Sequence, residues 1–297
     1  MVMTETAVAH GVRARRGPIG ILMTVPAFVL VVALLGVPIG QAVYYSMTNW
    51  DGLTTTWIGP STYLREFSNP AFWRVLQNNA LLLLAVPVAM ILSLAIAYVL
   101  NLKIPGWRLF RTLIFMPTAI SWVVIGMVAA RVFAQQGDLN GLLRALGLGF
   151  LQTDMLAGER TALLAVAIVF VWSMVGTNMI IFLAGFATMD GSLIEAARID
   201  GASGWVIFRS IIIPQMRRFL QFSFMITAIS AFTALFSLIY VMTGGGPGYG
   251  TTTLEFFVYQ TAFSQTNFGL GALLGIILFV IMALIGLMQH FVLKDSD

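Results

Sequence analysis

Between two long apolar runs, at 162–186 and 219–242, the sequence reads Glu195-Ala196-Ala197-Arg198-Ile199-Asp200-Gly201-Ala202. Phe208 and Ile211-Ile212-Ile213-Pro214 follow this segment. Three charged side chains cannot cross a bilayer in so short a segment, because each costs about 2.5 kcal/mol or more at the bilayer centre. The segment is therefore expected to form an ordered polar loop between two membrane spans.

The composition is typical of an integral membrane protein. Of the 297 residues, 59% are apolar and 9% are charged, whereas soluble domains carry about 25% charged residues. The net charge of +4 does not indicate nucleic-acid binding, because the basic residues lie at the ends of apolar runs and not along one face. The absence of cysteine excludes disulfides, thiol catalysis and thiolate metal sites.

Six apolar segments are long enough to span a membrane, which takes about 20 residues. They are 19–45, 79–101, 109–132, 162–186, 219–242 and 268–292. The predicted fold class is an all-α integral membrane protein with six transmembrane helices at 19–293, flanked by cytoplasmic tails at 1–18 and 294–297. The prolines near the first three spans, Pro26, Pro38, Pro87 and Pro117, are tolerated where neighbouring helices satisfy the freed carbonyl groups.

The orientation follows from the basic residues in the loops. Eleven Lys and Arg residues lie on one side of the six spans and five on the other. The positive-inside rule places the side with eleven in the cytoplasm. Both termini and the Glu195 segment are then cytoplasmic, and the loops at about 46–78, 133–161 and 243–267 face outward. The third outer loop opens with Thr243-Gly244-Gly245-Gly246-Pro247-Gly248, which predicts irregular backbone.

The polar loop, about 188–214, predicts two short helices joined at a glycine. Ser192 and Glu195 have the spacing of a capping box at a helix start. Gly201 is expected to end that first helix, since glycine takes the left-handed cap conformation at little cost. Ser203 is expected to cap the second helix, and Pro214 to close the segment. An ordinary amphipathic linker on the membrane surface has the same broad pattern, although it needs neither the acidic cluster nor the glycine.

The loop resembles the EAA motif, the cytoplasmic signature of permease subunits of binding-protein-dependent ABC importers. The matching residues are Glu195-Ala196-Ala197, Asp200-Gly201-Ala202, Phe208, Ile211 and Ile213-Pro214, with Ile213 where the family commonly has Leu. A second run is similar to the sugar-importer branch, the maltose and glycerol-3-phosphate type. It comprises Met242-Thr243-Gly244-Gly245-Gly246-Pro247, Thr251-Thr252-Thr253-Leu254 and Tyr259. The resemblance extends from the first span to the last.

The resemblance implies that the helix at 195–201 is a coupling helix. It would sit in a cleft of a separate ATPase subunit, with Glu195 pairing with a polar or basic group and Gly201 permitting the tight turn. The implied ATPase-coupling residues are Glu195, Ala196, Ala197, Asp200, Gly201, Ala202 and Pro214. The chain has no Gly-x-x-x-x-Gly-Lys-Ser/Thr phosphate loop. The expectation is a transport subunit that is not an enzyme and binds no cofactor, with ATP and Mg at the partner ATPase subunits.

Neutral polar residues in the fourth and fifth spans are the candidates for a solute pathway. The fourth span has Trp172, Ser173, Thr177 and Asn178 near mid-depth, and the fifth has Ser223, Thr227, Ser230 and Ser237 on one helical face. Sugar hydroxyl groups need neutral donors and acceptors and an aromatic face, and these residues supply both. The tentative pathway residues are Trp172, Ser173, Thr177, Asn178, Thr227 and Ser230. Hydroxyl side chains that only line helix–helix contacts remain the other interpretation.

The leading hypothesis is the permease subunit of an ATP-driven sugar or oligosaccharide importer in the cell membrane of a prokaryote. Its expected partners are a second homologous permease subunit, two ATP-binding subunits, an extracytoplasmic substrate-binding protein, membrane lipid and the sugar. A stand-alone secondary carrier for a neutral polar solute is the alternative, disfavoured by the lack of charged residues in mid-span and of inverted repeats. A membrane enzyme would need a catalytic arrangement within the spans, and none is present in the sequence. The sequence does not identify the sugar.

Overall fold

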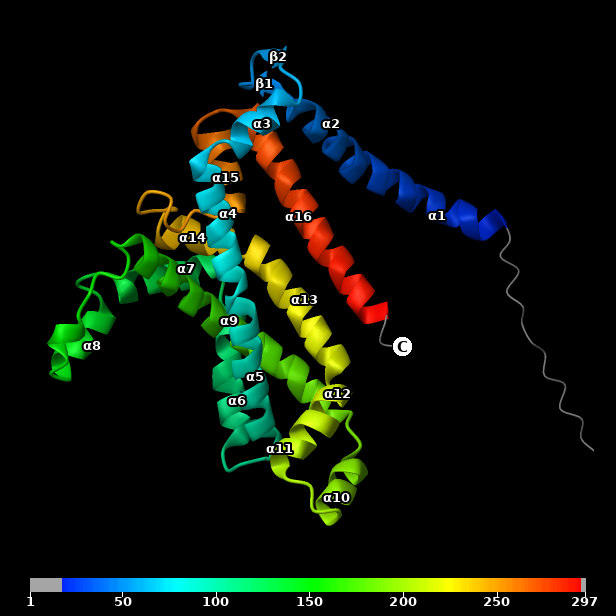
Figure 1. Ribbon diagram of the computed structural model, residues 1–297, viewed down its shortest axis with the longest axis vertical. Helices are drawn as coiled ribbons and strands as arrows, with labels where there is room; N and C mark the ends of the chain where they lie inside the picture. Colours follow the sequence, from blue (N-terminus) through cyan, green and yellow to red (C-terminus); the bar gives the residue numbers. More distant parts are fainter. Residues whose placement is uncertain (1–17, 295–297) are drawn as a thin grey trace, which may run out of the picture.

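The computed structural model describes residues 18–294, which form helices and one small hairpin (Figure 1). The first nine helices are α1 Pro18–Val31, α2 Val37–Tyr45, α3 Ser61–Phe67, α4 Pro70–Leu83, α5 Ala85–Asn101, α6 Trp107–Phe115, α7 Trp122–Phe133, α8 Asp138–Ala145 and α9 Glu159–Ala187. The others are α10 Gly191–Ile199, α11 Gly204–Ile207, α12 Ile213–Gln215, α13 Arg217–Thr233, α14 Leu235–Met242, α15 Leu254–Tyr259 and α16 Phe268–Lys294. The tails predicted at 1–18 and 294–297 lie almost wholly outside the described residues.

Short turns of other helical types connect several of these helices without a loop. The π-helical turns are η1 Val32–Gly36, η4 Phe208–Ile212 and η5 Gln260–Ser264, and the 3-10 turns are η2 Met116–Ala119 and η3 Gly149–Leu151. Because of them, α1 and α2 form one rod, and α11 continues through η4 into α12.

The centre of the bundle is α9, a helix of 29 residues. It packs along α5 over most of its length and also contacts α6, η2 and α13. Two glycines permit the closest approaches: a Cβ at Gly176 would lie 2.6 Å from the carbonyl oxygen of Ile114, and a Cβ at Gly185 would lie 2.6 Å from Met216 Sδ. Small residues of this kind let helix backbones come together in a membrane, where van der Waals contact drives association.

Four helical segments are long and apolar enough to cross a membrane, or up to six if each of two bent pairs is one span. The four are Met23–Tyr45, Pro70–Asn101, Glu159–Ala187 and Phe268–Met288. Each coincides with one of the apolar segments predicted from the sequence. The chain is therefore a multi-pass membrane protein built from helices.

The third and fifth predicted spans are not continuous helices. Between Trp107–Ala119 and Trp122–Ala145 the axis turns by 101°, and between Arg217–Thr233 and Leu235–Met242 it turns by 40°. The sharp turn follows Pro117, which has no N–H for the helical ladder, and Ile120 there takes an extended conformation with ψ of 138°. A straight helix over 109–132 was therefore the wrong expectation at this point.

The rod formed by α1 and α2 leaves the bundle and packs on little else in this chain (Figure 1). In the most apolar part of Met23–Tyr45, none of the residues is buried. Only its C-terminal end makes contact, against α16 and the hairpin. The hairpin consists of β1 Thr48–Trp50 and β2 Thr55–Trp57, which are antiparallel with Thr48 opposite Trp57.

Candidate functional site

The polar loop predicted at about 188–214 includes α10 and α11, which lie at the end of the molecule opposite the hairpin (Figure 1). None of the residues of α10 is buried, and Glu195 and Asp200 are both exposed. Exposed apolar side chains border these acids, with Ile199 86% exposed and Trp205 68% exposed. A helix that shows both acidic and large apolar groups to solvent has the surface of a contact region.

The start of α10 differs from the prediction. Asp190 is the N-cap, and its Oδ1 accepts a hydrogen bond of 2.9 Å from the backbone N–H of Ser192. The capping box of Ser192 with Glu195 is therefore wrong: the helix begins at Gly191, so Ser192 lies inside it and Glu195 is free to face outward. Hydrogen bonds to the charged carboxylate, first from the Ser192 side chain and then from its backbone N–H, lower the pKa of Asp190.

The end of α10 is fixed by Gly201, as predicted. Its φ is +78°, and the backbone N–H groups of Gly201 and Ala202 donate to the carbonyls of Arg198 and Ala197. This pair of bonds is a Schellman cap, which only glycine forms without cost. Ser203 then caps α11, and its Oγ accepts from the N–H of Val206 at 3.4 Å.

Pro214 does not end this segment. It lies in the first turn of α12, directly after the π turn η4, where the N–H of Ile213 bonds to the carbonyl of Phe208. The wider turn accommodates a residue that has no N–H to donate. The helical run therefore continues past Pro214 toward α13, and it joins the loop mechanically to the fifth apolar segment.

The inner face of α10 rests on the bundle. Ile194 and Ala197 pack against a buried cluster that includes Phe182 of α9, Ile207 of α11 and Met216. A cavity of about 400 Å³, lined among others by Tyr98, Asn101 and Arg198, lies beside this contact. Packed side chains therefore connect α10 to α9 and to the start of α13.

In the middle of the bundle, Asn178 joins α9 to α13. It is fully buried, and its Oδ1 accepts hydrogen bonds from Ser223 Oγ at 2.8 Å and Thr227 Oγ1 at 2.9 Å. Asn178 Nδ2 is buried and makes no hydrogen bond within the described residues. The structure therefore brings two of the pathway candidates, Asn178 and Thr227, into one closed polar contact, together with Ser223.

The other pathway candidates are not part of that contact. Ser173 is buried and donates to the carbonyl of Val169 in its own helix, while Thr177 and Ser230 are half-buried. Trp172 is 51% exposed and faces two apolar cavities of about 970 and 340 Å³ that adjoin α9. Of the six pathway residues, only Trp172 lines either of these two cavities.

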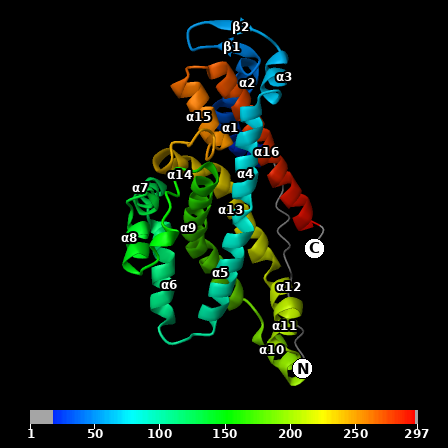
Figure 2. The same ribbon diagram turned by 60° about the vertical axis from the view of Figure 1, so that its left-hand side comes forward.

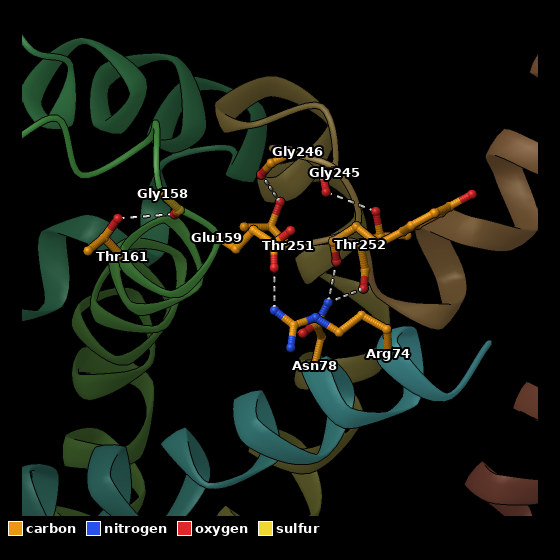
Figure 3. Close-up of polar contacts among 10 residues, drawn as sticks. Arg74, Asn78, Gly158, Glu159, Thr161, Gly245, Gly246, Thr251 and Thr252 are labelled. Carbon is orange, nitrogen blue, oxygen red and sulfur yellow. Dashed lines mark hydrogen bonds and ion pairs between the residues drawn. The ribbon is translucent and has the colours of Figure 1, made fainter. Parts of the chain in front are cut away.

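At the end of the molecule near the hairpin, two consecutive asparagines of α4 hold the loop that precedes α15. Figure 3 shows the first of them, Asn78, beside this loop. Asn78 Nδ2 donates to the carbonyls of Tyr249 at 2.7 Å and Thr252 at 2.9 Å. Asn79 Oδ1 accepts from the N–H of Leu254 at 2.7 Å, and its Nδ2 donates to Glu255 Oε2 at 3.3 Å. This clamp was not predicted, because an Asn pair at the start of an apolar run does not indicate a partner about 170 residues away.

An ion pair reinforces the clamp. Arg74 of α4 donates to Glu159 Oε2 at 2.7 Å, at the start of α9. Glu159 also lies directly against Gly250, where an added Cβ would come within 2.8 Å of its Cα. The glycine-rich loop at 243–250 is irregular, as predicted, and is held between α4 and α9 (Figure 3).

Glu255 is the one residue of the outer loop with a large change in acidity among the described groups. Its Oε1 is buried without a hydrogen bond, and burial raises its pKa to about 7. The Asn79 amide opposes this effect only in part. The carboxyl group is therefore close to half ionised at neutral pH.

Comparison with known proteins shows the family. Residues 89–295 match the family model described as the binding-protein-dependent transport system inner membrane component. The chain belongs to that family. It is a transport subunit, a permease, and not an enzyme.

Two curated relatives and one solved structure are similar over most of the permease. It is 33% identical to the multiple sugar-binding transport system permease protein MsmF of Streptococcus mutans over 88% of this chain and 90% of the relative. It is 32% identical to the sn-glycerol-3-phosphate transport system permease protein UgpA of Agrobacterium fabrum over 92% and 94%. A bacterial alginate ABC transporter, solved with a periplasmic protein that carries an alginate pentasaccharide, has the same fold, with a TM-score of 0.80, 18% identity and coverage of 94% and 95%.

Proposed function

We propose that this permease forms half of the translocation pathway of an ATP-driven ABC importer for a sugar or oligosaccharide. One observation carries the proposal: α10, with the sequence of the family's cytoplasmic signature, is exposed at one end of the bundle and packed against α9. The family membership and the relatives named for sugar transport support the substrate class. The proposed location is the cell membrane of a prokaryote.

In this proposal α10 is the coupling helix. Glu195 and Asp200 face the ATPase subunit, and the small side chain of the exposed Ala196 lets the helix seat closely. Ala197 and Ala202 lie on the inner side, against the buried cluster. Gly201 holds the turn. Ile194 and Ala197 transmit movement to the buried cluster below, and Pro214 keeps the run to α13 helical. ATP and Mg would be bound by the partner ATPase subunits.

A second permease subunit is the proposed partner within the membrane. The rod α1–α2 supports it, because an apolar helix with none of its most apolar residues buried needs another surface beside it or lipid all round. Counting each bent pair as one span gives six spans. An even number of spans fits both termini on the cytoplasmic side, where the positive-inside rule places them.

The proposed solute pathway runs beside α9 and α13. On this path Trp172 is exposed, and Thr177 and Ser230 are half-buried. By contrast, Asn178 and Thr227 are hydrogen-bonded to each other, and Ser173 is buried. We propose that α9 and α13 separate during transport, so that the hydroxyl groups of the sugar replace the Asn178–Thr227 contact. The Asn178 Nδ2 group, which has no partner in the described residues, supports this, because a buried donor left unpaired costs about 1–3 kcal/mol.

Co-purification from the native membrane tests the coupling proposal. Tagged wild type is expected to bring down an ATP-binding subunit, and Glu195→Lys and Gly201→Asp to bring down less. Gly147→Asp is the matched control, since Gly147 has φ of +75°, ends α8 with the same pair of backbone bonds, and also has open space around its Cβ. If the wild type purifies alone and still moves solute without ATP, the secondary-carrier alternative replaces the importer.

A further inference from the structure

Aromatic rings form an unbroken series between α14 and α15. Phe236 and Tyr240 stack with ring centroids 5.8 Å apart, and Tyr259 lies 5.3 Å from Phe236 and 5.6 Å from Tyr240. Phe263, in the π turn after α15, lies 5.6 Å from Tyr259. These four rings come from two segments about 20 residues apart, and they cover one side of the bent end of the fifth span.

The series continues to the outer hairpin. Phe268, the first residue of α16, lies 6.0 Å from Phe263 and 5.1 Å from Trp50 of β1. Trp50 in turn stacks on Tyr45, the last residue of α2, at 4.2 Å. We call the seven residues the outer aromatic strip; they are Tyr45, Trp50, Phe236, Tyr240, Tyr259, Phe263 and Phe268.

Two rings of the strip are exposed, while the other five are half-buried, and Phe236 and Tyr259 also pack against the buried cluster around α9. Phe263 is 66% exposed and Tyr240 is 51% exposed, whereas Leu238 and Ile239, on the other side of α14, are fully buried. The helix α14 therefore uses its aliphatic side to pack against α7 and leaves its aromatic side open. The exposed rings of Tyr240 and Phe263, backed by half-buried rings, are available to a flat, partly apolar ligand.

The chemistry of the strip fits a neutral sugar. The C–H faces of a sugar ring lie on aromatic faces, and sugar hydroxyl groups pair with tyrosine hydroxyl groups. The rings of Tyr240 and Tyr259 lie 5.6 Å apart, so two neighbouring rings of the strip each carry a phenol hydroxyl group. None of the seven residues carries a charge. Glu255, in the same short helix α15, points to Asn79 of α4 instead.

Interfacial aromatic belts in membrane proteins are the obvious comparison. Belt residues are mainly Trp and Tyr at the level of the lipid headgroups. A single exposed ring in the middle of a span is Phe279 of α16: it is 52% exposed, and no ring contact joins it to another aromatic residue among the described residues. The strip differs because every ring touches the next. The strip also runs from the hairpin to α14, the end of a candidate span. A solute released outside the membrane would pass along this side of the molecule.

We propose that the outer aromatic strip is a stacking site for a neutral oligosaccharide on its way from the outer surface to the middle of the membrane. The proposal rests on the sugar-import function proposed above and adds the site and the charge class of the substrate. A longer neutral sugar contacts more of the rings, so its uptake is more sensitive to their removal. Acidic saccharides find no cation on the strip.

The test is sugar uptake by the complete complex in proteoliposomes, with its binding protein outside and ATP inside. The probes are lactose, N,N′-diacetylchitobiose and maltotriose, offered to wild type, Tyr240→Leu, Phe263→Leu and the matched control Phe279→Leu. For the sugar that wild type imports, each strip variant is expected to raise the apparent KM by roughly two- to tenfold, because an aromatic contact contributes about that factor. Phe279→Leu is expected to match wild type, and Tyr240→Phe to lie between wild type and Tyr240→Leu.

The outcomes separate this proposal from the importer function. Uptake by wild type with an unchanged KM in both strip variants overturns the stacking site and leaves the importer intact. A loss of the second permease from the purified Tyr240→Leu and Phe263→Leu complexes also overturns it, because the strip would then be a subunit interface. If wild type takes up none of the sugars and its ATPase activity ignores the binding protein, the importer function itself fails.

Discussion

Removing the Asn78 side chain should loosen the outer loop in a measurable way. Asn78 is 1% exposed, and its Nδ2 holds the carbonyls of Tyr249 and Thr252. In Asn78→Ala both bonds are lost and both carbonyls lose this partner. At about 1 kcal/mol for each bond, the local free energy of opening falls by about 2 kcal/mol, which is roughly thirtyfold in the opening equilibrium.

Hydrogen exchange measured by mass spectrometry reports this opening directly. Peptides that cover 249–254 should exchange roughly thirtyfold faster in Asn78→Ala than in wild type, while peptides of α5 and α9 should keep their rates. Asn101→Ala is the control, since Asn101 is exposed at the far end of α5. A change of less than about threefold in 249–254, or an equal change throughout the bundle, would refute the reasoning.

Three further predictions concern the two ends of the molecule. Because Gly201 has φ of +78° and open space around its Cβ, Gly201→Asn should keep ATPase co-purification near the wild-type level, whereas Gly201→Val should lower it. Burial raises the pKa of Glu255 from 4.5 to about 7, so ionising this carboxyl group in the folded protein costs about 3 kcal/mol of stability. The melting temperature should therefore fall as the pH rises from about 5 to 7 and stay level above pH 7. The Glu255→Gln variant should not show that fall. A double-mutant cycle on Arg74→Gln and Glu159→Gln should give a coupling free energy of about 1 kcal/mol or less. The reason is that both side chains are exposed to solvent, by 38% and 53%. A coupling free energy above about 2 kcal/mol would contradict this account of the ion pair.

The helical membrane architecture and the glycine that ends α10 could be predicted from the sequence. Apolar length identifies helices such as Glu159–Ala187, and the glycine cap at Gly201 is a local signal that needs no partner. The start of α10 was misassigned because Asp190, two residues before Ser192, is an equally good cap. Boundaries of this kind depend on which of two neighbouring caps the rest of the fold favours.

Long-range contacts could not be predicted in the same way. The Asn78 clamp joins residues more than 170 positions apart, and the Asn178 contact joins two spans at separations of 45 and 49. The sequence grouped Asn178 and Thr227 by type, as neutral polar residues in neighbouring spans, without pairing them. Similarly, the 101° turn after Pro117 depends on how η2 packs on α9, because a proline in a membrane helix is often tolerated without a break.

The most direct test of the central claim is solute accumulation by the reconstituted complex. Proteoliposomes that contain the permease with its co-purified partners, with the binding protein outside, should accumulate a neutral sugar only when ATP and Mg are enclosed. Glu195→Lys should abolish that accumulation, while the matched outer variant Gly147→Asp retains it. Accumulation without ATP, or an equal rate in Glu195→Lys, would contradict the account of α10 as the element that couples ATP to transport.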